Sequence, residues 1–218
     1  MYVGRPDTSN PRCDSMAVVG KALDSSGRHE EALSVFEATL ALRRRHWSHD
    51  EAGMLRAEMS LAVCLHHLKR FDEALALNRA VYAKRVAIYG VSHEDTILSG
   101  VNLTASLFVL KLFAEGKFFL RNEMLPVVRR SLGADHEHTL GINQNLAYAL
   151  MKDSERTSDD LLEASDIIMD VLDRRRRVFG PAHPGTRLAE GLAVRLHSEI
   201  RAFSENAARQ RAARKNPY

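Results

Sequence analysis

The chain has 218 residues, of which 45% are hydrophobic and 27% are charged, and its formal net charge is only +3. This composition is typical of globular proteins and allows one or two domains or one repeat array, and the small charge gives no reason by itself to expect nucleic-acid binding. Two cysteines, Cys13 and Cys64, are too few for a disulfide framework, and no run of about 18 apolar residues predicts a membrane span. The N-terminal stretch lacks the apolar core of a signal peptide. We therefore expect a soluble, cytoplasmic protein.

Helices are expected along most of the chain, because alanine, leucine and arginine dominate it and favour helix. Residues 1–14 are predicted to be a disordered leader, residues 15–205 a helical repeat domain and residues 206–218 a basic, disordered tail. The spacing of apolar residues predicts helices at 15–26, 29–46, 52–68, 71–89, 93–112, 115–131, 136–152, 159–178 and 184–205. No stretch alternates apolar and polar residues in the manner of a strand, so the predicted fold class is all-α.

Short segments recur along the chain at a nearly fixed spacing. "GRHEEAL" at 27–33 matches "KRFDEAL" at 69–75, an offset of 42 residues, and "SLAVCL", "NLTASL" and "NLAYAL" align at offsets of 42 and 43. Each repeat contains two helices joined by a short turn. Because one helix pair cannot bury its own apolar face, such pairs stack side by side. We expect about four antiparallel pairs and a terminal helix.

A second signature, G-x-x-H-x-x-T, occurs as "GVSHEDT" at 90–96, "GADHEHT" at 133–139 and "GPAHPGT" at 180–186. Each glycine follows a long predicted helix and is expected to stop it in a left-handed conformation. Ser92 and Asp135 are predicted N-caps of the next helices, and each histidine should lie in a first helical turn and pack on the preceding helix. No base or nucleophile recurs with the histidine, so the motif indicates architecture and not catalysis.

These residues resemble the tetratricopeptide repeat, in the variety of about 42 residues found in the kinesin light chain family. The resemblance covers roughly residues 16–200 and rests on "GPAHPGT", "HTLGINQNLAYAL", "KRFDEAL" and "RRRRVFG". It implies a right-handed superhelical stack whose first helices line a concave groove. It also implies a non-catalytic scaffold or adaptor that binds a protein or peptide ligand.

The chain departs from the family pattern in three places. Gly116 replaces the usual alanine, Pro126 lies inside a predicted helix, where proline costs about 3 kcal/mol unless the helix kinks, and a longer turn occurs near "KDSERTSDD". The coiled coil of motor light chains is not seen, so a general scaffold is the safer expectation. The chain could also be a fragment of a larger multidomain signalling or motor-adaptor protein, and it could pack against further repeats or a second copy.

In the family that this chain resembles, an asparagine in the N-L-A segment faces the groove and hydrogen-bonds the ligand backbone. Asn102 and Asn145 occupy that position, whereas Ser60 and Gly191 replace it elsewhere. The alternative role for either asparagine is a structural hydrogen bond between helices. The candidate groove residues are Arg56, Ser60, Val63, His67, Val101, Asn102, Ala105, Phe108, Gln144, Asn145, Tyr148 and Lys152.

No catalytic residue, metal site or cofactor is predicted. The histidine pairs 46/49, 66/67 and 136/138 lack the H-E-x-x-H arrangement, and no Cys/His quartet is present. No G-x-S-x-G elbow or phosphate-binding loop occurs, and Gly20 in "GKALDS" is interpreted as a close-packed helix glycine.

Two basic segments leave an alternative open. The tetra-arginine at 174–177 ends a predicted helix, where cations complement the helix dipole. The basic tail could instead bind an anionic ligand or RNA, and its candidate residues are Arg209, Arg211, Arg214 and Lys215. Nucleic acid is not the expected partner, because the chain outside this tail is near neutral.

Overall fold

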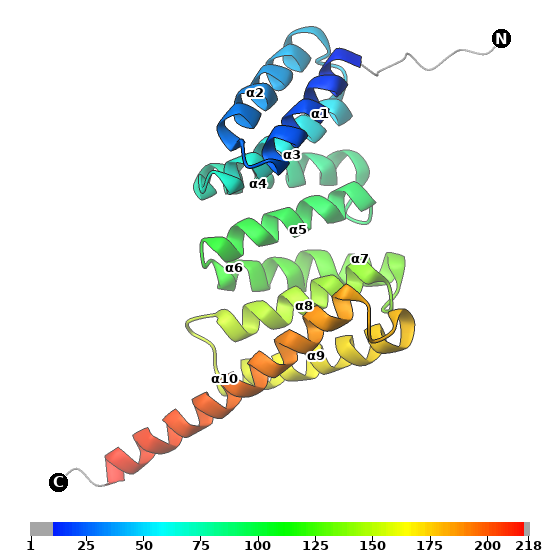
Figure 1. Ribbon diagram of the computed structural model, residues 1–218. Helices are drawn as coiled ribbons and strands as arrows, with labels where there is room; N and C mark the ends of the chain where they lie inside the picture. The colour runs from blue at the N-terminus through cyan, green and yellow to red at the C-terminus, as the bar shows by residue number, and fades with distance from the viewer. Residues whose placement is uncertain (1–10, 216–218) are drawn as a thin grey trace. The chain divides into compact units, whose positions relative to one another are not determined.

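A computed structural model describes residues 11–215, with side chains described for 11–206, 208 and 209, and this part of the chain consists of helices and turns without a strand (Figure 1). The all-α prediction is confirmed. The helices are α1 (Pro11–Ser25), α2 (His29–His46), α3 (Glu51–His67), α4 (Phe71–Tyr89), α5 (Glu94–Val109), α6 (Phe113–Phe118), a π-helical segment η1 (Phe119–Met124), α7 (Leu125–Leu132), α8 (Glu137–Lys152), α9 (Ser158–Phe179) and α10 (Pro184–Lys215).

The helices divide into two compact units. Unit 1 comprises Met1–Gly90 and Leu98–Ser106, and unit 2 comprises Val91–Ile97 and Leu107–Tyr218, so α5 contributes its middle to one unit and its ends to the other. Each unit has its own buried core.

In unit 1, α1 pairs with α2 and α3 pairs with α4. The core joins Phe36 of α2, Cys64 of α3 and Ala74 of α4, all at most 2% exposed. Gly20 of α1 packs on this core, since a Cβ atom built there would lie 2.6 Å from Cε1 of Phe36. The prediction that Gly20 is a close-packed helix glycine is confirmed.

A buried ion pair holds the start of unit 1 together. Arg43 of α2 is 3% exposed, and its two terminal nitrogens donate to carboxylate oxygens of Asp50 and Asp14, both at 2.7 Å. Asp50 also caps α3 by accepting from the Gly53 N–H at 2.9 Å. The predicted leader of 1–14 is too long at its end, because residues 11–14 belong to α1: Cys13 is fully buried and Asp14 binds Arg43. Residues 1–10 lie outside the described part.

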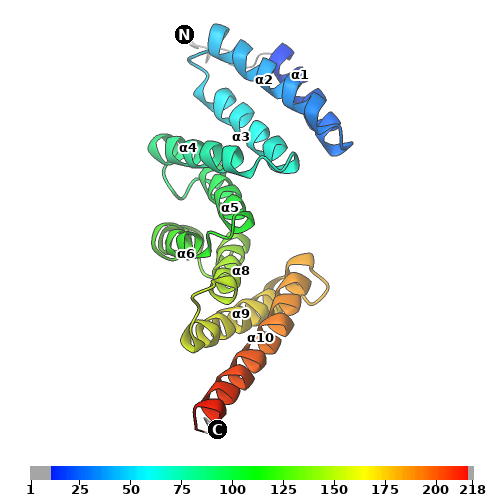
Figure 2. The same ribbon diagram turned by 90° about the vertical axis from the view of Figure 1, so that its left-hand side faces the viewer.

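In unit 2, α8 and α9 form an antiparallel pair, and α10 packs on α9 and also contacts α8. The core contains fully buried leucine and isoleucine side chains of α8 and α9, and Leu196 of α10 is 1% exposed. In Figures 1 and 2 the C-terminal part of α10 extends past α9. The predicted disordered tail is therefore helical up to Lys215, because alanine, arginine and glutamine favour helix even without packing.

The segment formed by α6, η1 and α7 accommodates the two unusual residues of the sequence, Gly116 and Pro126. Pro126 does not break the helix, because the π-helical segment η1 precedes it and the Leu125 N–H bonds to the Leu120 carbonyl five residues back. Pro126 then lies in the first turn of α7, where its missing N–H is tolerated. Gly116 is required by Phe108, whose Cε1 would lie 2.6 Å from an added Cβ atom.

Candidate functional site

The three glycines of the recurrent motif end α4, α7 and α9. Gly90, Gly133 and Gly180 have φ of 79°, 89° and 83°, a region that favours glycine. Their ψ values of 165°, 168° and 167° make the backbone extended, so the predicted left-handed helical conformation is wrong in ψ although correct in the sign of φ.

The three histidines of the motif cap the next helix. In His93, His136 and His183, the Nδ1 atom accepts from the backbone N–H two residues on, at 3.2 Å in each case. The predicted cap Asp135 is wrong, because His136 is the N-cap of α8 and Asp135 instead binds arginines of α9. At the start of α5, His93 rather than the predicted Ser92 accepts from the N–H of Asp95. The imidazole acts here as a hydrogen-bond acceptor.

The threonines complete the turn. The Oγ1 atom of Thr139 donates to the Gly133 carbonyl at 2.7 Å, and that of Thr186 donates to the Gly180 carbonyl at 2.9 Å. The motif therefore closes the connection between two helices from both sides, with glycine setting the direction, histidine capping and threonine tying the turn. The glycine, histidine and threonine of the motif therefore have structural roles.

A cavity of unit 2 lies between α8 and α10. Its volume is about 330 Å³. Three predicted groove residues, Gln144, Asn145 and Tyr148, line it from α8. The residues of α10 that line it are Arg187, Leu188, Gly191, Leu192 and Arg195.

Three polar groups of this cavity lack a hydrogen-bond or ion-pair partner among the described residues. The Oε1 atom of Gln144 is buried and has no hydrogen-bond donor among residues 11–215. Arg187 and Arg195 are exposed, and no carboxylate of the described chain pairs with either. Leu188 is 65% exposed beside them. The cavity thus combines one unsatisfied acceptor, two free cations and an exposed apolar side chain.

Other predicted groove residues lie around two smaller cavities of unit 1. One, of about 130 Å³, is lined by Val63, Asn102 and Ala105 together with His66 and the Asn78–Ser106 hydrogen-bonded pair. The other, of about 160 Å³, is lined by Lys21, Asp24, Phe36, Met59, Ser60 and Val63. Asn102 and Asn145 therefore line different cavities.

The remaining predicted groove residues make contacts within the protein. Phe108 and Tyr148 pack on each other, with ring centroids 5.5 Å apart. Lys152 lies 3.6 Å from the Glu199 carboxylate of α10, so its charge is compensated. Val101 is half-buried and Arg56 is exposed.

The tetra-arginine of α9 is not a free cationic patch. Arg174 and Arg177 bind the Asp135 carboxylate at 2.8 and 3.2 Å, and Arg176 binds Glu190 at 2.8 Å. These pairs favour a structural role for 174–177. Of the predicted anionic-surface residues, Arg209 is exposed on α10, whereas the side chains of Arg211, Arg214 and Lys215 lie outside those described.

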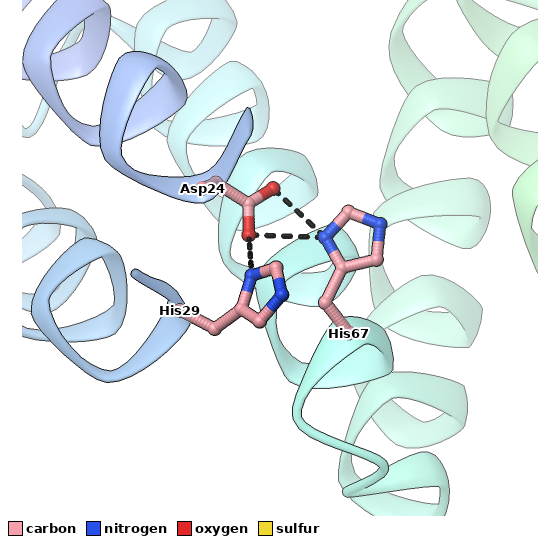
Figure 3. Close-up of side chains that lie close together, drawn as sticks. All are labelled: Asp24, His29 and His67. Carbon is pink, nitrogen blue, oxygen red and sulfur yellow. Dashed lines mark hydrogen bonds and ion pairs between the residues drawn. The ribbon is translucent and has the colours of Figure 1, made fainter. Parts of the chain in front are cut away.

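A cluster that the sequence did not reveal lies at the end of α1 in unit 1 (Figure 3). An oxygen of Asp24 lies 2.7 Å from Nδ1 of His29, and Nδ1 of His67 lies 3.0 and 2.9 Å from the two oxygens of Asp24. Burial raises the pKa of Asp24, but the hydrogen bonds from His67 and His29 outweigh it, so the pKa lies below its ordinary value. Of the neighbouring histidines 66 and 67, only His67 takes part in this cluster.

Antiparallel helix pairs that recur about every 42 residues and share one capped connection define a helical repeat protein. The sequence profile of the Tetratricopeptide repeat family matches residues 12–46, 59–95 and 144–185, more than half of the chain. The chain belongs to the tetratricopeptide repeat family.

Solved structures with the same fold come from proteins related to kinesin light chains. The nearly identical TPR-like repeats of a kinesin light chain candidate from Podosopora anserina share 16% identity at a TM-score of 0.73, over 95% of this chain and 98% of that one. BtubC (BKLC) from P. vanneervenii shares 15% identity at a TM-score of 0.70, over 93% of this chain and 81% of that one. At these identities the likeness concerns the fold.

No curated protein sequence matches the chain. Among residues 11–215, no helix has both the length and the apolar character needed to cross a bilayer. The fold is one that generally serves as a scaffold for protein–protein interaction.

Proposed function

We propose that this protein is a non-catalytic scaffold that binds an acidic peptide segment in the cavity between α8 and α10. The observation that carries the proposal is the set of unsatisfied polar groups around that cavity: the Gln144 acceptor and the Arg187 and Arg195 cations. A peptide backbone N–H would satisfy Gln144, whose buried oxygen otherwise costs about 1–3 kcal/mol. Acidic side chains of the peptide would pair with the two arginines.

The other lining residues suit the same kind of ligand. Asn145 offers both a donor and an acceptor to an extended backbone. Leu188 and Gly191 leave one side apolar and open, because Gly191 carries no side chain and nothing lies within 4 Å of where a Cβ atom would be. A peptide with an apolar residue beside acidic ones would match this arrangement.

The decisive experiment is selection of ligands from a random peptide display library with the full chain. We expect the selected peptides to be acidic. Their affinity, measured by fluorescence anisotropy, should fall about tenfold or more when both Arg187 and Arg195 are changed to glutamate, since each loses a charge-assisted contact. The Asn145→Ala variant should weaken binding less.

The control is Arg209→Glu, the same kind of substitution made once on the exposed surface of the same helix, outside the cavity. It should leave the affinity unchanged. If Arg209→Glu abolished binding while the cavity variants did not, the ligand would bind the basic end of α10, and the alternative anionic-ligand or RNA function would replace the proposal.

A further inference from the structure

We propose that Asp24, His29 and His67 form a binding site for one divalent transition-metal ion, of which Zn²⁺ is the best match. Each residue provides one ligand atom, and these atoms lie within 4.8 Å of one another. Figure 3 shows both imidazole rings directing Nδ1 toward the same carboxylate. The site is independent of the proposed peptide cavity, which lies in unit 2.

The distances suit a metal after a small adjustment. Zinc binds imidazole nitrogen and carboxylate oxygen at about 2.0–2.2 Å, so two ligands of a tetrahedral ion lie about 3.4 Å apart. The separations of Asp24 from His29 and His67 are 2.7 and 2.9 Å. An outward shift of less than about 1 Å by the carboxylate would bring these two separations to the value for a tetrahedral ion.

Local backbone structure holds the three ligands in place. Asp24 and His29 are separated by the tight turn between α1 and α2, which Gly27 permits with φ of 80°. The Cys64 thiol donates to the His29 carbonyl at 3.2 Å and so fixes the first residue of α2. His67 is the last residue of α3, so three helix ends converge on the site. A site built on helix ends is preorganised.

The donor set has the right chemistry and access. Two imidazoles and one carboxylate are ligands that zinc accepts, and a three-ligand zinc site keeps a fourth position for water. Asp24 is 11% exposed, whereas His29 and His67 are 30% and 43% exposed, so the ion can enter from the histidine side. On binding, each ring releases its Nδ1 to the metal and carries its proton on Nε2, and the ionised Asp24 needs no further deprotonation.

Cys64 does not complete the coordination. The group of ligand atoms that lie within 4.8 Å of one another contains Asp24, His29 and His67 but not the Sγ atom of Cys64. Its hydrogen already points to the His29 carbonyl. The proposed site therefore has three protein ligands and keeps a fourth position open for water.

The test uses the full chain without an affinity tag, treated with a chelator and titrated with ZnCl₂ in a calorimeter. We expect one zinc ion per chain. His67→Ala and Asp24→Asn should each weaken binding by more than about tenfold, because each removes one of three ligands. His66→Ala is the matched control, since its ring supplies no ligand atom and packs on the Phe71 ring and edge-on against that of His67, and it should bind as the wild type does.

Two further readouts keep the result decisive. Co²⁺ in place of zinc should give the intense visible bands of a four-coordinate ion in the wild type and in His66→Ala, and lose them in Asp24→Asn. Zinc should also raise the melting temperature of the wild type but not of His67→Ala. No zinc uptake, or equal uptake by the wild type and a folded His67→Ala variant, would show that Asp24 is only a hydrogen-bond acceptor for two imidazoles.

Discussion

The two units bury an arginine at matching places but treat its charge differently. Arg43 of unit 1 and Arg175 of unit 2 each lie near the end of the second helix of a pair, and they are 3% and 4% exposed. Arg43 is neutralised by two carboxylates. The Nε and Nη1 atoms of Arg175 have no acceptor among residues 11–215, and burial lowers the pKa of this guanidinium.

This difference shows that two repeats can place an arginine in the same packing position without providing the same partners for its charge. Both arginines fill the same kind of space between helices, yet only Arg43 meets a partner because "HD" at 49–50 brings Asp50 to the start of α3. In unit 2 the corresponding connection is capped by His183, and the carboxylate whose charge acts on Arg175, that of Glu137, forms no ion pair with it within 4.0 Å among the described residues. A buried charge stabilises a fold only when it is paired and hydrogen-bonded.

Asp50→Ala tests most directly whether the pairing of Arg43 stabilises unit 1, and we expect it to have the largest effect. The substitution leaves Arg43 buried with one partner and removes the N-cap of α3, so we expect unit 1 to lose about 3–5 kcal/mol of unfolding free energy. Trp47, the single tryptophan, adjoins this site and reports the unfolding of unit 1 in a urea titration by its fluorescence.

The control for Asp50→Ala is Glu31→Ala, which breaks an ion pair with Arg28 whose two side chains are more than half exposed. It should cost far less unfolding free energy than Asp50→Ala, because water screens this exposed pair. Equal effects of the two substitutions would mean that the buried position of Arg43 contributes nothing special.

A second pair of substitutions compares the two units at a close-packed glycine. Gly20→Ala and Gly116→Ala each place a methyl group 2.6 Å from a phenylalanine ring, and we expect costs of about 1–3 kcal/mol. Gly20→Ala should cost more, because Phe36 is 2% exposed and enclosed, whereas Phe108 is only half-buried and can move. Trp47 fluorescence and amide hydrogen exchange of α6 measure the two effects. A larger effect at Gly116 would contradict the role of enclosure.

Arg175→Met would sharpen the contrast between the arginines. It removes an incompletely bonded cation and keeps most of the side-chain volume, so we expect unit 2 to be unchanged or stabilised by about 1 kcal/mol. Slower hydrogen exchange in α8–α10 would register the gain. Arg43→Met in unit 1 should instead destabilise, since it leaves two carboxylates unpaired. Destabilisation by both variants would show that Arg175 has a favourable partner after all.

The smallest expected effects are losses of stability at low pH, which arise from the protonation of Asp24 and Asp135. Both Asp24 and Asp135 have a pKa below the ordinary value, Asp24 because hydrogen bonds from two histidines outweigh its burial, and Asp135 mainly through its hydrogen bond from Arg174. The stability that each adds is therefore complete above the unfolded pKa, near 4, and is lost as pH falls through the lower folded pKa.

Trp47 fluorescence in metal-free buffer should show a loss of stability in unit 1 below about pH 4, and Asp24→Asn should flatten that dependence. Asp135 is exposed, so in unit 2 the matching effect of Asp135→Asn should be slight and should disappear in high salt. If the stability of Asp24→Asn fell with pH as steeply as that of the wild type, Asp24 would not be the source of the pH dependence.

Much of the helical framework could be predicted from local residue patterns. The helix bounds were predicted within a few residues from α2 to α9, and the role of Gly20 was inferred from its place in an apolar helix. The helical extent of the two termini was missed. At the N-terminus α1 begins earlier because Asp14 meets Arg43, a contact across 29 residues that no local pattern encodes.

The candidate sites were predicted only in part. Gln144, Asn145 and Tyr148 do line a cavity, but Lys152 is bound to Glu199 and His67 to Asp24, partners that are 47 and 43 residues away. The arginines of α10 that flank the cavity escaped notice, because the repeat pattern fades after 186. A helical wheel extended along 184–195 is the one signal that could have found them.

The sequence by itself determined the period, the helices and the turns, because these depend on residues within one or two helical turns of each other. The tertiary structure alone decided which charges are neutralised and which side chains meet across helices. Those outcomes depend on how neighbouring helix ends converge, and a shift of one residue along a helix turns a side chain by 100°, so the same composition can leave an arginine paired, as at Arg43, or without sufficient partners, as at Arg175.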